Sequence, residues 1–235
     1  MNTSIILLRQ LNRQFIASVI LVFTSFLVNA QQPATIPIVT KDHALVLQAD
    51  KDGRLWITHF GKKMDNEQDY AKAAAAYHFK DDNAGIYSSA YTPAGTWSLS
   101  EPALQVIHAD GNISLDLKLQ RYDVQKENDN ISTTSVKLKD PIYDLSVTLF
   151  YKVWANENVI EQWTEITNNE KGSVVLEKYA SANLYFTNKD FYLTSFQGEY
   201  LKEMQPLEEK LLQGMKSIES KMGTRAMLLG TPNFI

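Results

Sequence analysis

Carboxylate side chains are the residues of this sequence that could act as paired acids and bases. One reaction of that kind, glycoside hydrolysis, needs two carboxyl groups about 5 to 5.5 Å apart for retention, or about 6.5 to 9.5 Å apart for inversion. Glu161 and Glu165 fall on one face of a predicted strand, but four residues at about 3.3 Å each separate them by about 13 Å. Asp81 and Asp82 are adjacent on a predicted loop, where solvation is the simpler interpretation. The sequence alone therefore shows no assembled catalytic pair.

Metal and cofactor sites are not expected either. The stretch Asp50-Lys51-Asp52-Gly53 begins like a calcium loop, but the position that should supply a bidentate carboxylate is Gly61. A turn is therefore the favoured interpretation. No G-x-S-x-G elbow and no phosphate-cradling glycine loop occurs, and there is no cysteine for a thiolate site. The four histidines, His43, His59, His78 and His108, lack a short ligand spacing such as H-E-x-x-H. His59 and His108 fall at strand ends, where half-exposed imidazoles are expected.

Aromatic rings offer another route to sugars, because a flat ring can stack on the apolar face of a pyranose. Tyr91 and Trp97 lie beside Pro93 and Gly95, outside the strand patterns, and are the candidates for a ligand surface. The remaining tryptophans lie within predicted strands and are expected in the core: Trp56, Trp154 and Trp163.

The N-terminal segment has the features of a secretory signal peptide. Arg9 and Arg13 precede an apolar run of 14 residues that ends at Val28, and the small residue Ala30 suits signal peptidase. A spanning helix needs about 20 apolar residues, so cleavage near Ala30 is favoured over a membrane anchor. We expect residues 1–30 to be removed, and the mature chain to be periplasmic or secreted without stable membrane insertion.

Composition and charge limit the possible partners. The chain has 235 residues, of which 44% are hydrophobic and 21% charged, as in an ordinary globular protein. It has 23 basic and 27 acidic residues, so loss of Arg9 and Arg13 leaves 21 minus 27, or −6. A negative chain is not expected to bind nucleic acid. Export without cysteine implies no disulfide framework, so stability must come from buried apolar surface.

Alternation of apolar and polar residues predicts half-buried strands from residue 44 onward. Residues 44–50 and 54–60 flank a Lys-Asp-Gly turn sequence and predict a first hairpin. Residues 103–108 and 112–124 flank Ala109-Asp110-Gly111 and predict a second. Its second arm places these leucine and isoleucine side chains on one face: Ile113, Leu115, Leu117 and Leu119.

Longer strands follow and predict the fold class. A strand over 142–154 begins after a break at Asp140-Pro141, and polar turns then lead into strands over 159–167 and 173–186. The pattern fails between residues 61 and 97, where an alanine run could form a short helix, and long excursions of this kind are often functional. Long strands joined by polar turns favour an all-β, antiparallel two-layer sandwich. The alternate residues of 142–154 should face its core: Tyr143, Leu145, Val147, Leu149, Tyr151 and Val153.

Three segments resemble glycoside hydrolase family 36, the α-galactosidases. Residues 89–119, SAYTPAGTWSLSEPALQVIHADGNISLDLKL, are similar to its glycine-containing loop followed by an E-P-A-L-x-V-x-H-A-D-G hairpin. Residues 151–186 resemble its V-I-E-R-W-T-E-I-x-N segment and the L-E-x-x-A-S-A strand after it. Residues 191–224 resemble its G-x-W-x-x-E and L-x-x-G-x-x-x-I-E-S-x-x-G segments. The matches run in order over nearly the whole mature chain.

The resemblance implies a galactose-mutarotase-like β-supersandwich over 43–235, after a short linker at 31–42. Leu212, Met215 and Ile218 have helical spacing, but Pro206 and Gly214 disfavour a helix. Together with the resemblance, this predicts sandwich strands over 207–222, with Gly214 at a bend or bulge. We expect the domain to be incomplete at its C-terminus.

The resemblance also implies which residues carry chemistry. Family members have a following (β/α)8 barrel with two aspartates for retaining hydrolysis of α-galactosides, and no position here matches either motif. We therefore expect no catalytic residue in this chain. In oligomeric members a loop after a G-K-R-like turn helps to shape a sugar pocket; Gly61-Lys62-Lys63 is similar to that turn, which implies substrate contacts for Asp69, Tyr91 and Trp97. The family's D-L-S and Y-G-x-G-D runs are altered here.

The expected role is thus a non-catalytic N-terminal domain of an exported α-galactosidase-like hydrolase. Its partners would be the catalytic barrel, an α-galactoside-type oligosaccharide bound by the complete enzyme and, as a possibility, other copies of the chain. Two alternatives stay open at this point. One is a stand-alone carbohydrate-binding protein with Tyr91 and Trp97 as its platform. The other is an aldose-epimerase-like enzyme, which would need His59, His78 and His108 to converge with a carboxylate.

Overall fold

The computed structural model divides the chain into two compact units, one ending at Tyr185 and one beginning at Phe186. It describes residues 34–76, 80–81, 85–86, 89–95, 99, 101–186, 190–199, 202–212, 214, 216–218 and 231–234. The predicted signal peptide lies outside these residues. Within the described ranges, no helix has the length and apolar character needed to cross a membrane.

One layer of the first unit is an antiparallel sheet with the strand order β1-β2-β3. Its strands are β1 (Ala34–Val39), β2 (His43–Ala49) and β3 (Leu55–Lys62). The predicted first hairpin is confirmed as β2 and β3. Asp50 closes its turn, since Oδ1 accepts the backbone N–H groups of Asp52 and Arg54, each at 2.9 Å. β1 falls within 31–42, so the linker prediction is wrong there: Ile36 and Ile38 are buried because β1 pairs with β2.

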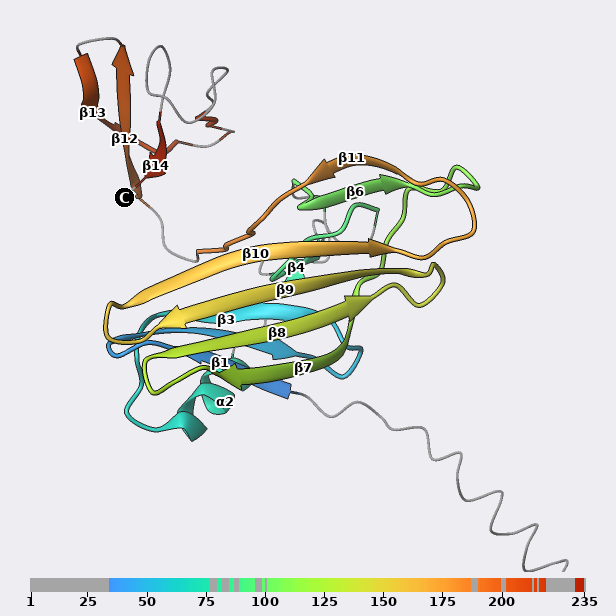
Figure 1. Ribbon diagram of the computed structural model, residues 1–235, viewed down its shortest axis with the longest axis horizontal. Helices are drawn as coiled ribbons and strands as arrows, with labels where there is room; N and C mark the ends of the chain where they lie inside the picture. Colours follow the sequence, from blue (N-terminus) through green and yellow to red (C-terminus); the bar gives the residue numbers. More distant parts are fainter. Residues whose placement is uncertain are drawn as a thin grey trace, which may run out of the picture. The chain divides into compact units, whose positions relative to one another are not determined.

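The second layer is an antiparallel sheet with the order β10-β9-β8-β7 (Figure 1). Its strands are β7 (Lys118–Lys126), β8 (Ile131–Lys139), β9 (Leu145–Trp154) and β10 (Val159–Asn168). Odd-numbered residues of β9 from Leu145 to Val153 are buried. The predicted core face of this strand is therefore confirmed, because alternation places every second side chain on the same side of a sheet.

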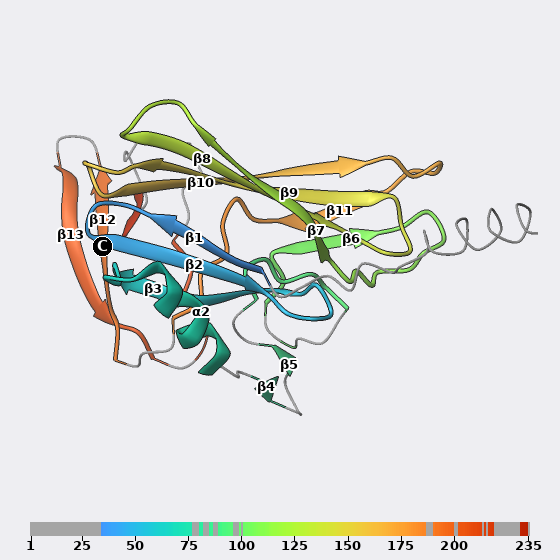
Figure 2. The ribbon, with the colours of Figure 1, turned by 90° about the horizontal axis from the view of Figure 1, so that it is seen from below.

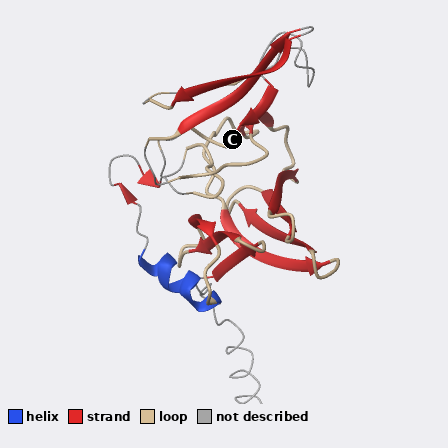
Figure 3. Cartoon of the chain, turned by 90° about the vertical axis from the view of Figure 1, so that its left-hand side faces the viewer, coloured by secondary structure: helices blue, strands red, loops and turns tan. Residues whose placement is uncertain are grey.

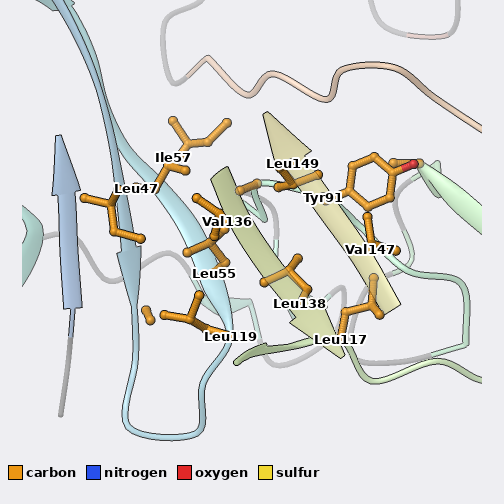
Figure 4. Close-up of a cluster of buried hydrophobic side chains, with 14 of the residues drawn as sticks. Leu47, Leu55, Ile57, Tyr91, Leu117, Leu119, Val136, Leu138, Val147 and Leu149 are labelled. Carbon is orange, nitrogen blue, oxygen red and sulfur yellow. The ribbon is translucent and has the colours of Figure 1, made fainter. Parts of the chain in front are cut away.

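The two layers enclose one apolar core. Leu47, Leu55 and Ile57 of the first sheet face Val136, Leu138, Val147 and Leu149 of the second (Figure 4). Seen along the sheets, β1 to β3 form one layer and β7 to β10 the other (Figure 2). This arrangement is the predicted all-β sandwich.

The excursion after β3 contains helix α2 (Glu67–Ala76), the only helix among the described residues (Figure 3). Tyr70 on α2 is buried against Ala44 and Val46, which point to the opposite face of β2 from Leu45 and Leu47. The Tyr70 hydroxyl also accepts the backbone N–H of Met64 at 3.0 Å. The helix is therefore a third layer on the outer face of the first sheet. Two short strands follow in this excursion, β4 (Lys80–Asp81) and β5 (Gly85–Ile86).

The predicted second hairpin is wrong. Strand β6 (Leu104–Ile107) pairs with β11 (Val175–Tyr179), far along the chain, rather than with residues 112–117. Only the predicted turn at residues 109–111 is present, and the His108 N–H closes it by donating to the Asn112 carbonyl at 2.8 Å. Leu115 and Leu117 still reach the core, because the segment keeps its alternation while its backbone bonds elsewhere, as Leu115 N–H does to the Ala94 carbonyl at 3.1 Å.

The second unit contains a small antiparallel sheet with the order β13-β12-β14. Its strands are β12 (Tyr192–Glu199), β13 (Lys202–Lys210) and β14 (Thr231–Phe234). Pro206 lies in β13, which is at the edge of this sheet as far as the described residues show, and an edge strand tolerates the missing N–H. The strand prediction for 207–222 holds as far as Lys210, whereas the described residues of 211–218 form no strand. Gly214 has a φ of 121°, which confirms the bend.

Candidate functional site

Asp69, one predicted substrate residue, lies in the first turn of α2. Its Oδ1 accepts a hydrogen bond from Lys72 Nζ at 3.0 Å, and its Oδ2 accepts one from Asn66 Nδ2 at 3.3 Å. The hydrogen bond from Lys72 is the main cause that lowers the pKa of Asp69, and Asn66 adds to it. Asp69 is thus a solvent-accessible, ionised carboxylate that can accept hydrogen bonds from a ligand.

Tyr91, the second predicted substrate residue, is part of the sandwich core and is only 2% exposed. Its hydroxyl donates to the Ala180 carbonyl at 2.9 Å, and burial raises its pKa. With its ring faces packed against core side chains (Figure 4), Tyr91 cannot stack on a sugar. The ligand-surface prediction for this residue is wrong, because the chain around residue 91 turns into the core.

The predicted residues do not form one site in the described part of the chain. Tyr91 lies between the two sheets, whereas Asp69 lies on α2, beyond the outer face of β1 to β3. Trp97 lies outside the described residues. Asn183 anchors the described residues 89–92, because its Nδ2 donates to the Ser89 carbonyl at 3.0 Å and to Thr92 Oγ1 at 3.2 Å.

The most developed polar cluster surrounds His108, which was expected to be half-exposed. The imidazole is buried, and Nδ1 lies 2.8 Å from Glu170 Oε1. Its ring stacks on Tyr143, with centroids 3.5 Å apart and planes 8° from parallel. The Tyr143 hydroxyl donates to Asp110 Oδ2 at 2.8 Å and accepts from Asn112 Nδ2 at 2.8 Å.

Electrostatics in this cluster follow from its hydrogen bonds. The backbone N–H of Asn112 and the Tyr143 hydroxyl lower the pKa of Asp110. The same contact with Asp110 raises the pKa of Tyr143, since an ionised phenol beside a carboxylate would be repelled. The Asp110 carboxylate is therefore held ionised, and the Tyr143 phenol is held neutral.

A histidine oriented by a carboxylate is a common device for proton transfer, but this one has no access to a substrate. His108 Nε2 is buried and has no hydrogen-bond partner. The cluster is therefore structural: it ties the turn after β6 to the loop before β9 and the turn after β10. Sequence reasoning missed it because residues 108 and 170 are far apart in the chain.

His59 and His108, the two described histidines of the epimerase-like alternative, contact different residues and do not share a carboxylate in the described part of the chain. His59 Nε2 lies 3.0 Å from the Lys62 carbonyl, and its ring lies 6.1 Å from that of Tyr70 on α2. His108 instead contacts Glu170 and Tyr143, and His78 lies outside the described residues. Among the residues that the structure describes, no group of three or more histidine and acidic side chains could hold a metal ion.

Comparison with known proteins decides the family. Residues 53–230, more than half of the chain, match the sequence profile of the "Glycosyl hydrolase family 36 N-terminal domain". The chain belongs to this family. The resemblance found in the sequence is confirmed.

Curated relatives of this family 36 domain are α-galactosidases. Alpha-galactosidase Mel36A of Lactobacillus acidophilus is 28% identical over 148 residues, which cover 57% of this chain and 20% of that protein. The bifunctional alpha-galactosidase/sucrose kinase AgaSK of Mediterraneibacter gnavus is 25% identical over 201 residues, covering 76% of this chain and 22% of that protein. The family 36 chain thus spans about a fifth of the length of these relatives.

Solved structures show the same fold. The alpha-galactosidase of Lactobacillus brevis superposes with a TM-score of 0.74 at 20% identity, covering 86% of this chain and 31% of that one. A variant of the family 36 alpha-galactosidase AgaA from Geobacillus stearothermophilus, in complex with raffinose, also gives a TM-score of 0.74, at 18% identity, covering 85% and 31%. The family 36 N-terminal domain is therefore an antiparallel β-sandwich in this chain as well.

Proposed function

We propose that this chain is the non-catalytic N-terminal sandwich domain of an exported, α-galactosidase-like retaining glycoside hydrolase. The observation that carries the proposal is the match of residues 53–230 to the family 36 N-terminal domain. The sandwich interior adds support, because the side chains that form its core cluster are apolar. Relatives are named α-galactosidases, and related structures hold raffinose or stachyose. An α-galactoside-type oligosaccharide is accordingly the proposed substrate of the complete enzyme.

In this proposal the domain supports the catalytic barrel and rims its sugar pocket. Asp69 is the best placed of the predicted contacts, because an ionised carboxylate at a helix N-terminus is accessible and held by Lys72 and Asn66. The buried ring of Tyr70 fixes the helix that carries it. A group on a rigid element keeps its position better than one on a loop. Trp97 is proposed as a second contact, and Tyr91 is a core anchor instead.

Hydrolysis by the purified chain tests the proposal. We expect no release of 4-nitrophenol from 4-nitrophenyl α-galactoside above the rate in buffer, with an active α-galactosidase as the positive control. Steady turnover by the chain alone would contradict a non-catalytic role. Calorimetric titration with raffinose separates the stand-alone carbohydrate-binding alternative, which predicts saturable heat, from a supporting domain, which predicts none.

Export is a separate part of the proposal. Arg9, Arg13 and the apolar run before Ala30 support it. Expression of the whole reading frame in a Gram-negative host, followed by mass spectrometry of the periplasmic fraction, should find a chain that starts at Gln31. An unprocessed chain retained in the cytoplasm would overturn export without affecting the domain assignment.

A further inference from the structure

The outer face of the β10-β9-β8-β7 sheet carries large aromatic rings, although Trp154 and Trp163 were expected in the core. Core residues of β9 are odd-numbered and those of β10 are even-numbered, so Phe150, Trp154 and Trp163 point outward. Phe150 and Trp163 are register partners, and their rings stack with centroids 4.8 Å apart and planes 3° from parallel. Trp154 lies further along β9, with Lys152 Nζ 5.3 Å from its ring. Aromatic residues of this kind are enriched at the centres of protein interfaces.

Charges of opposite sign lie on the two sides of these rings. Exposed Glu161 and Glu165 lie on β10, next to the aromatic pair. Lys137 lies on β8 and Arg121 on β7, the strands on the other side of β9 (Figure 1). Within the described part of the chain none of these four makes an ion pair, whereas Lys139 and Lys152 pair with Asp144 and Glu127. The β10 edge of the face is therefore acidic, whereas the opposite edge carries Lys137 and Arg121 together with one exposed carboxylate, Asp123 of β7.

The strand register explains why these charges do not pair within one molecule. Glu165, Thr148, Lys137 and Arg121 form a single row across the four strands. Adjacent strands lie about 4.8 Å apart, so the backbones that carry Glu165 and Lys137 are about 10 Å apart, with Thr148 between them. A partner surface that brings a basic group over β10 and an acidic group over β8 would satisfy both charges.

We propose that this face binds the same face of a second copy of the chain, around a two-fold axis that runs parallel to the strands and close to β9. Such an axis exchanges the two edges of the face, so it brings Glu165 of each copy over Lys137 of the other. The rings of Phe150 and Trp163 then lie at the centre. An isologous interface needs this kind of antisymmetric pattern. A second copy of the chain already has the acidic and the basic group that this face needs. An unrelated partner would have to present a matching pair of charges at the same spacing.

The size of the face suits a dimer of moderate stability. Strands of 9 or 10 residues at about 3.3 Å per residue, in four rows about 4.8 Å apart, give a plan area on the order of 600 Å². A standard interface buries about 800 Å² per partner. Two sheets packed face to face also interleave their side chains. The dimer should therefore depend on concentration, and should weaken with salt because charge pairs hold its edges. This inference does not depend on the proposed enzymatic role.

Charge exchange between Glu165 and Lys137 tests the interface by sedimentation velocity of the purified chain. Glu165→Lys and Lys137→Glu should each raise the dimer dissociation constant about tenfold or more, because each puts like charges together at two symmetric contacts. The double variant should recover the wild-type dissociation constant to within about threefold. An equimolar mixture of the two single variants should form a heterodimer although each alone is monomeric. Asp129→Lys, with the same change of charge at the turn between β7 and β8, should leave the dimer unchanged.

Several results would overturn the proposal. They are a wild-type chain that stays monomeric at all concentrations, a dimer insensitive to both single variants, and a mixture of single variants that does not associate. A monomer whose tryptophan fluorescence responds to raffinose would assign the face to a sugar instead. Matching urea midpoints for all variants would show that none of these outcomes comes from unfolding.

Discussion

The buried imidazole of His108 lies parallel to the phenol ring of Tyr143, with the ring centroids 3.5 Å apart. The pair joins the turn after β6 to the loop before β9, and the bond from His108 Nδ1 to Glu170 adds the turn after β10. Three connections from distant parts of the sequence are thereby held at one end of the sandwich. This cluster, the Tyr91 hydroxyl and the close approach of Gly95 to Ser114 can each be tested by substitution.

Glu170→Ala should lower the free energy of unfolding by about 1–3 kcal/mol. The change leaves His108 Nδ1 buried without a partner, and an unsatisfied buried group costs about that amount. Urea denaturation followed by far-UV circular dichroism measures the effect. Lys171→Ala is the matched control, because its exposed side chain should change stability by less than about 0.5 kcal/mol. Equal effects of the two variants would show that the His108 contact contributes little.

Tyr91→Phe should destabilise the chain by about 0.5–1.5 kcal/mol, because it removes only the hydroxyl that donates to the Ala180 carbonyl. The core ring itself is retained. Tyr122→Phe provides the comparison at an exposed ring on β7 and should have no measurable effect. If Tyr91→Phe changed the response to raffinose while stability stayed constant, Tyr91 would be a ligand residue rather than an anchor.

Gly95→Ala should be more destabilising than Gly111→Ala. Both glycines have positive φ, 85° and 83°, so each substitution strains the backbone by about 1–2 kcal/mol. A Cβ at residue 95 would also lie 2.7 Å from the Ser114 Cα, whereas one at residue 111 would meet nothing within 4 Å. Thermal unfolding of the two variants, compared with the wild type, measures the difference. A larger shift for Gly111→Ala would contradict the close packing at Gly95.

Asp110→Asn should make stability less dependent on pH under acidic conditions. Hydrogen bonds from the Asn112 N–H and the Tyr143 hydroxyl lower the pKa of Asp110 in the folded state. A carboxylate with a lowered pKa stabilises the fold above its unfolded value of about 3.9, and this contribution is lost as pH falls through the folded value. The stability difference between wild type and variant should therefore shrink between about pH 5 and pH 2. A constant difference over that range would rule out this contribution.

Local patterns in the sequence predicted the strands and the fold class well. The alternation from Leu145 to Val153 appears as the core face of β9, and the polar turn at residues 51–53 appears between β2 and β3. These features depend on side-chain alternation and turn chemistry within a few residues, which the sequence states directly. The family resemblance added a prediction of the whole sandwich architecture. The match of residues 53–230 to the family 36 domain confirmed that resemblance.

Aromatic residues were the least predictable, because a strand pattern does not say which face is covered. Tyr91 was expected at a ligand surface and lies in the core. Trp163 was expected in the core and stacks on Phe150 on the outer face. Both faces of a strand can carry large rings, and the choice between them depends on what the second sheet covers.

The sequence by itself determined the alternation of the strands, their polar turns and their membership of a β-sandwich family. Only the tertiary structure decided that β6 pairs with β11, that His108 is buried against Glu170, and that Glu165 and Lys137 share one row of the outer face. The physical reason is the separation along the chain over which each interaction acts. Turn chemistry and alternation act between neighbours in the chain, whereas strand partners and buried polar pairs depend on packing between segments that many residues separate.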